Sequence, residues 1–170
     1  MATSPAAITI SGLVTTFEQS GGTTAANASS TLKYDGFDDS LKLTSATTPT
    51  VTKDAFAEIT LTAGAATIDL TAVTDVDGVV KNFNALKIRC VKFRAKSTSA
   101  GAFTIAKGAS NGFTGLGASF SVTLPANAAG GAWVQFYDAG GGTAVSGTVK
   151  TLDVTGTGSQ VLQVFIAGGA

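Results

Sequence analysis

Residues 86–96 read Leu-Lys-Ile-Arg-Cys-Val-Lys-Phe-Arg-Ala-Lys, an alternation of apolar and basic residues. Because successive side chains of a β-strand point to opposite faces, this pattern indicates a strand with one buried and one exposed face. The alternation slips by one residue between Cys90 and Val91. Such a slip predicts a strand that crosses between two sheets or, as we favour, a β-bulge that keeps the apolar side chains inward.

A bulge would place five cations on the outward face at intervals of about 7 Å, namely Lys87, Arg89, Lys92, Arg94 and Lys96. Such a ladder repels itself unless negative charge lies close to it. We therefore expect either acidic side chains on the adjacent strands or a contact with an acidic partner or a neighbouring subunit. No nucleic-acid partner is expected, because base-stacking aromatic residues are missing from this face and Phe93 lies on the apolar one.

Further strands follow from residue 55 onward, where short alternating runs are separated by turn residues about every ten positions. This spacing predicts an all-β fold, an antiparallel β-sandwich with about eight strands in two sheets over residues 55–170. The turns are expected at segments such as Ala63-Gly64, Asp77-Gly78 and Asn111-Gly112. The residues expected to face the core are Ile59, Leu61, Ile68, Leu70, Phe103, Ile105, Phe120, Val122, Leu124, Val134, Phe136, Leu152, Val154, Leu162, Val164 and Ile166.

Residues 1–54 differ from the rest, because they are rich in Thr, Ser and Ala and thin in large apolar side chains. Their early apolar cluster consists of Ile8, Ile10, Leu13 and Phe17. One interpretation is an extended N-terminal arm. The other is a hairpin of residues 32–37 and 41–43 that belongs to the sandwich.

Composition excludes much chemistry. The chain has no His and a single Cys, so it offers no imidazole base and no intrachain disulfide, and we expect neither an enzyme nor a bound cofactor or metal. No apolar run approaches the ~20 residues that span a bilayer, and the N-terminus does not resemble a secretory signal, so we expect no membrane partner and synthesis in a cytoplasm. Net charge is zero, yet residues 1–80 carry nine acidic and three basic residues, and residues 81–170 carry two and eight.

Three smaller features were candidates for sites. The Asp35/Asp38/Asp39 and Asp75/Asp77 groups could hold Ca²⁺, but turn-forming Asp is the better interpretation. Trp133, Gln135 and Tyr137 share one face of their predicted strand and form either a ligand-binding face or a contact with a subunit or loop.

Three further strand positions bear on packing. Phe165 and Val161 lie opposite the Leu162 series, and burial on both faces of that strand predicts an oligomer or an arm across the sandwich. Cys90 is expected to be a small buried hydrophobe rather than a nucleophile.

The strand and turn phrases at residues 67–71 (TIDLT), 86–93 (LKIRCVKF), 108–113 (GASNGF) and 151–160 (TLDVTGTGSQ) resemble the small β-sandwich virion proteins of tailed bacteriophages. The resemblance covers about residues 55–170 and includes no catalytic motif. It implies a jelly-roll-like domain on the virion that binds the major capsid protein as a decoration (cement) protein, often as a trimer. Ile8, Ile10 and Phe17 would then contact a neighbour. A head or tail fibre module that binds host receptor or glycan through Trp133, Gln135 and Tyr137 is the alternative.

Overall fold

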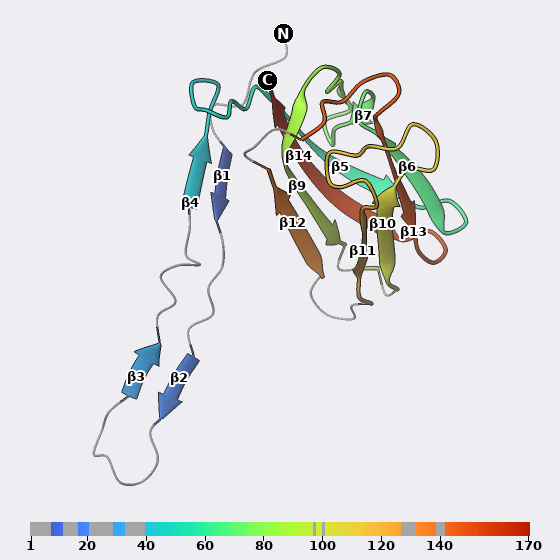
Figure 1. The fold of residues 1–170 in the computed structure, drawn as a ribbon. Helices are drawn as coiled ribbons and strands as arrows, with labels where there is room; N and C mark the ends of the chain where they lie inside the picture. Colours follow the sequence, from blue (N-terminus) through green and yellow to red (C-terminus); the bar gives the residue numbers. More distant parts are fainter. Residues whose placement is uncertain are drawn as a thin grey trace.

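The structure, a computed structural model, describes residues 8–11, 17–20, 29–32, 40–96, 98–99, 101–126, 132–138 and 142–170, with side chains described from Leu43 onward. Within these residues every regular element is a β-strand, and all strand pairs are antiparallel. The all-β prediction is therefore confirmed (Figure 1).

Eight strands form two four-stranded sheets. Sheet I has the order β12-β9-β14-β5, with β12 (Trp133–Tyr137), β9 (Lys87–Ala95), β14 (Val161–Gly169) and β5 (Lys53–Thr60). Sheet II has the order β11-β10-β13-β6, with β11 (Ser121–Leu124), β10 (Phe103–Lys107), β13 (Thr151–Thr155) and β6 (Ala65–Asp69). A short ladder of β7 (Val73–Thr74) and β8 (Val80–Lys81) lies beside β5.

The eight strands pair in a nested order along the chain. The first pairs with the last (β5 with β14), the second with the seventh (β6 with β13), the third with the sixth (β9 with β12), and the fourth with the fifth (β10 with β11). Consecutive strands therefore alternate between the sheets, except at the β10–β11 pair.

The apolar faces of the two sheets pack on one shared core. Four phenylalanines, Phe83, Phe93, Phe103 and Phe113, are almost fully buried in it. All residues expected from alternation to face inward belong to this core or pack against it, from Ile59 on β5 to Ile166 on β14. The hydrophobic pattern therefore identified the core correctly, because one buried face fixes the register of a strand.

The slip in β9 is a β-bulge, as favoured, and its extra residue lies just before Cys90, where the sequence slip begins. Ala167 of β14 lies opposite Cys90 and Gly168 lies opposite Ile88, so Arg89 is the extra residue. Ile88 and Val91 both reach the main core across the bulge, whereas Cys90 packs in a second cluster. The expectation that the bulge keeps every apolar side chain inward is wrong for Cys90, because both residues of a bulge oppose one residue of the partner strand.

The N-terminal strands form two separate two-stranded ladders outside sheets I and II (Figure 1). β1 (Ile8–Ser11) pairs with β4 (Ser40–Leu43), and β2 (Phe17–Ser20) pairs with β3 (Ser29–Leu32). The second of the two interpretations paired residues 41–43 with residues 32–37, whereas in the structure β4, which includes residues 41–43, pairs with β1. Leu13 and residues 33–37 lie outside the described residues.

The expected turn at Ala63-Gly64 meets the turn at residues 156–158, where the sequence also predicts one, at one end of the sandwich. Gly64, with φ +83°, donates its N–H to the Gly158 carbonyl at 2.8 Å and accepts from the Gly156 N–H at 2.8 Å. A Cβ on Gly64 would lie 2.8 Å from the Gly156 carbonyl oxygen. Glycine is required there by the positive φ and by the close approach of the two backbones.

We expect Phe93→Ala to reduce the free energy of unfolding by about 3–5 kcal/mol, because the truncation leaves a cavity between the sheets. Urea unfolding followed by circular dichroism measures the change. Phe56→Ala is the matched control, since Phe56 belongs to the same sheet but is 39% exposed. Equal losses for the two variants would contradict the packing described.

Candidate functional site

The outer face of sheet I combines two sets of residues that the sequence suggested separately. Register places Trp133 next to Arg94 and Gln135 next to Lys92, and directly opposite residues of an antiparallel pair share a face. The rows continue through β14 and β5, where Arg94 meets Gln163 and Lys92 meets Phe165, whose other neighbour is Phe56. We name this surface the cation–aromatic face and define it by Phe56, Lys92, Arg94, Trp133, Gln163 and Phe165.

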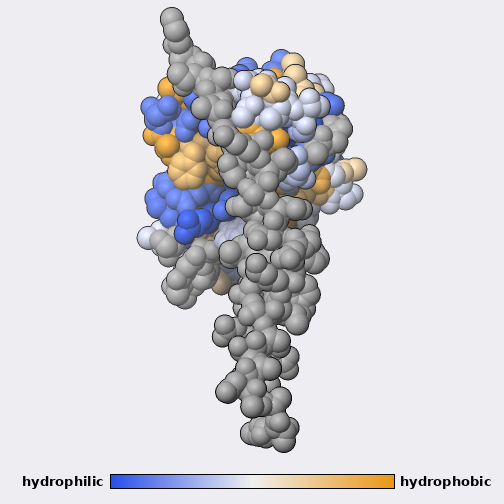
Figure 2. Space-filling view, turned by 90° about the vertical axis from the view of Figure 1, so that its left-hand side faces the viewer, coloured by the Kyte–Doolittle hydropathy of each residue, from blue (hydrophilic) through white to orange (hydrophobic). Residues whose placement is uncertain are grey.

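Aromatic rings and cations are in contact on this face. The Lys92 ammonium lies 4.6 Å from the centroid of the Trp133 ring, within the range of a cation–π interaction. All of the residues that define this face except Trp133 line a shallow pocket of about 260 Å³, namely Phe56, Lys92, Arg94, Gln163 and Phe165. Trp133 is 51% exposed. Figure 2, which views the molecule from the side of β4 and β12, shows hydrophobic and hydrophilic residues in adjacent patches.

The five predicted cations do not form one ladder. Lys96 forms a salt bridge of 2.7 Å with Glu58 on β5, so this one cation has an acidic partner, although β14 separates β5 from β9 and the partner is not on an adjacent strand. Hydrogen bonds from Lys96 and then from Gln163 lower the pKa of Glu58, so this carboxylate stays charged. Arg89 is buried and donates from Nη2 to the Ala170 carbonyl at 2.7 Å, while Lys87 is half-buried at the start of β9.

The bulge is the physical reason, because its extra residue interrupts the alternation that a continuous ladder requires. Lys92 and Arg94 remain on the outer face, and in the part of the chain that the structure describes neither forms a salt bridge. The outer face of sheet I therefore carries two cations that no described carboxylate neutralises.

A second hydrophobic cluster covers one end of this outer face. It consists of Leu43 and Val51 from the segment before β5, together with Cys90 and Ala167, and Phe165 packs against it. Residues of the same chain therefore bury part of the outer face of β14, so this burial does not require another subunit. Cys90 is buried as expected, and desolvation raises the pKa of its thiol to about 11 despite the nearby Lys92 charge.

The outer face of sheet II has a different character. Its outward positions carry small and hydroxyl side chains and the carboxyl groups of Asp69 and Asp153. Asp153 accepts hydrogen bonds from Thr67 Oγ1 at 2.9 Å and from the Ala109 N–H at 2.8 Å. Thr104 and Thr123 are hydrogen-bonded to each other across β10 and β11. Sheet I has large exposed apolar side chains, whereas the described strands of sheet II have none.

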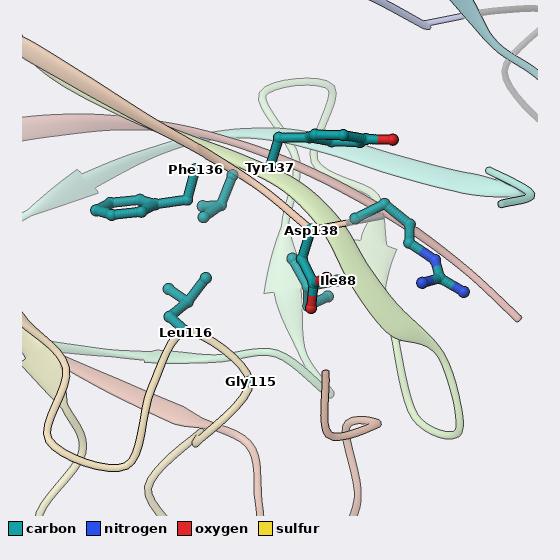
Figure 3. A pocket seen from close by; sticks show the side chains of 8 residues that line it. Ile88, Gly115, Leu116, Phe136, Tyr137 and Asp138 are labelled. Carbon is teal, nitrogen blue, oxygen red and sulfur yellow. The ribbon is translucent and has the colours of Figure 1, made fainter. Parts of the chain in front are cut away.

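A smaller pocket of about 150 Å³ lies where β12 and β9 meet the loop at Gly115 and Leu116 (Figure 3). Phe136 and Tyr137 lie on opposite sides of β12 in this view, so Tyr137 belongs to the outer face with Trp133, as predicted. The Asp138 carboxylate at the pocket accepts from the Gly142 N–H at 2.7 Å. This hydrogen bond joins the end of β12 to Gly142.

The acidic groups behave as turn residues where they are described. Asp75 accepts from the Val76 N–H at 2.8 Å, and Asp77 accepts from the Val79 N–H at 2.9 Å. Asp35, Asp38 and Asp39 lie outside the described residues. Elsewhere in the described ranges, no three potential metal ligands come together, and no helix has the length and hydrophobicity to cross a membrane.

Comparisons with protein-family models, with curated proteins and with solved structures find no match to this chain. Its function is therefore inferred from the fold and its surfaces. Sequence reasoning missed Phe56, although a large aromatic residue on the polar side of the alternating run Ala55-Phe56-Ala57-Glu58 was the available signal.

We expect the Cys90 thiol to resist an aromatic disulfide reagent in the folded protein at about pH 8, because burial keeps it protonated and a thiol reacts as its thiolate. Unfolding in guanidinium should release one reactive thiol per chain. Leu43→Ala should accelerate the reaction of the folded protein by uncovering the cluster, and Val79→Ala, far from the thiol in sequence and exposed, is the control. Rapid labelling of the unmodified folded protein would contradict this burial.

Proposed function

We propose that this protein is a structural component of a tailed-bacteriophage virion, made in the cytoplasm of the bacterial host. In this proposal it is a decoration (cement) protein that binds the major capsid protein at the outer capsid surface and stabilises the head as a homotrimer. The nested pairing of eight strands supports the finer fold assignment of a jelly-roll-like sandwich.

The observation that carries the proposal is the pair of two-stranded ladders outside the sheets. A single two-stranded ladder is marginally stable in water and needs a further surface to pack on. Strands β1 and β2 contain Ile8, Ile10 and Phe17, and in the proposal these residues pack on a neighbouring capsid subunit or extend one of its sheets. Each contact across a junction between capsid subunits must break before the shell fails, which is how decoration stabilises a head.

The base of this N-terminal arm is well suited to such a role. Leu43, the last residue of β4, packs with Val51, Cys90 and Ala167 on sheet I. The Val51 N–H also donates to the Thr44 carbonyl at 2.9 Å. Apolar packing and a backbone hydrogen bond therefore connect the arm to the sandwich, so that a capsid contact made by the arm would hold the whole domain.

Deletion of residues 1–39 should abolish binding to purified capsids while the sandwich stays folded, because the deletion removes β1 to β3 and keeps Leu43. Co-sedimentation with capsids measures binding, and circular dichroism with thermal unfolding checks the fold. A full-length variant with Ile8→Ser, Ile10→Ser and Phe17→Ser is the matched control for the apolar contacts, and it should also bind weakly. Undiminished binding of the truncated protein would refute this role of the arm.

The second candidate function is a head or tail fibre module that binds a host receptor or glycan. It is favoured by Trp133 and Tyr137, which are 51% and 38% exposed on one face together with Gln135. Aromatic rings stack on sugar faces, and an amide can bind sugar hydroxyls.

For this alternative, a glycan array should give a specific signal that Trp133→Ala removes and Val80→Ala, another exposed apolar substitution, leaves unchanged. Array binding that is insensitive to Trp133→Ala would exclude this face as the glycan site.

A further inference from the structure

The exposed large hydrophobic side chains of the described residues fall into two groups. Phe56, Trp133 and Tyr137 lie on the outer face of sheet I. Val76, Val79 and Val80 belong to the β7–β8 hairpin and are 60%, 48% and 59% exposed. Exposed apolar groups gathered in this way mark interaction sites, and we name the second group, residues 73–81, the valine hairpin.

The valine hairpin is held rigidly with its valines exposed. Its turn is closed by the Gly78 N–H to the Asp75 carbonyl and by the Asp75 N–H to the Val79 carbonyl, each at 2.9 Å. The Val76 N–H donates to the Phe56 carbonyl at 2.9 Å, which fastens the hairpin to the edge of β5. A preorganised apolar protrusion loses little conformational entropy when it binds.

Charge makes the two surfaces complementary. Asp77 at the tip of the hairpin is exposed, and its Oδ1 accepts the Val79 N–H, whereas the cation–aromatic face carries Lys92 and Arg94 without a described carboxylate partner. Asp75 of the hairpin is paired with Lys81 at 3.7 Å, so Asp77 is the exposed charge at the tip. The tip is thus apolar and acidic, and the face is apolar and basic. Opposite charges favour contact of hairpin with face, and like charges disfavour contact of either surface with its own copy.

The positions of the two surfaces fit a ring of copies. The valine hairpin lies at the β5 edge of sheet I, and Trp133 lies on β12 at the opposite edge. A contact between two different surfaces is heterologous, and repeated heterologous contacts form a closed ring when the rotation between copies closes.

We propose that the valine hairpin of one copy docks on the β12 side of the cation–aromatic face of the next copy, and that three copies close into a ring. Val76, Val79 and Val80 pack against Trp133, and Asp77 lies beside Lys92 and Arg94. The proposal specifies the subunit contact of the homotrimer in the proposed function. It is tested on purified protein without capsid, so its failure is distinguishable from failure of capsid binding.

The experiment uses full-length chains with one new cysteine each, which is informative because Cys90, the single native cysteine, is buried. Val79→Cys and Gln135→Cys chains are mixed, oxidised and separated on non-reducing gels. The mixture should give a disulfide-linked pair that neither variant gives alone, and a chain with both substitutions should give a covalent trimer. Cross-linking of either single variant with itself, or no cross-link in the mixture, would overturn the proposal.

Charge variants provide a second test by light scattering after size exclusion. The unmodified protein should have the mass of a trimer, and Arg94→Glu should weaken assembly by at least about tenfold, because it places two carboxylates together. Adding Asp77→Lys to Arg94→Glu should restore assembly, because the double substitution again places opposite charges together, while circular dichroism confirms that each variant is folded. A monomer mass for the unmodified protein, or a trimer unaffected by Arg94→Glu, would refute the contact.

Discussion

Two residues of β9, Arg89 and Cys90, lie opposite the single residue Ala167 of β14, and the surfaces of the protein depend on this mismatch. β9 is an inner strand of sheet I, so its register is fixed on both sides by hydrogen bonds. Beyond the bulge, Val91 and Phe93 enter the core and Lys92 and Arg94 face outward. A continuous strand would bury a cation or expose Phe93, and both changes are costly in a close-packed sandwich.

The outer faces of the two sheets differ in chemistry, so the two sides of the domain are not equivalent as binding surfaces. Sheet II presents hydroxyl groups and small side chains, which water solvates well, whereas sheet I presents rings and cations next to the base of the N-terminal ladders. The contacts that we propose with other molecules are therefore concentrated on one side and along the β5 edge. In the proposed virion role, this arrangement separates a surface for neighbouring copies from strands that contact the shell.

Alternation was sufficient to predict the core, because one buried face per strand leaves a period of two that can be read locally. The β-bulge was also predicted, but its place was not, since the slip in hydrophobicity at Cys90 and Val91 does not say which residue lacks a cross-strand partner. The contact between Trp133 and Lys92 could not be predicted locally, because it depends on the pairing of β12 with β9, which are far apart in the sequence. The valine hairpin was missed because the sequence around Asp77-Gly78 indicates only a turn, and exposure of its valines is a tertiary property.

The nested order of the strands has a consequence for biosynthesis. β14 lies between β5 and β9, so sheet I remains divided until the last strand of the sandwich has been made. Only the β10–β11 pair joins consecutive strands within the two sheets, and the other pairs close progressively longer loops. Folding of such a non-local topology is slow, on the order of milliseconds to seconds, and sheet I can close only after β14 has left the ribosome.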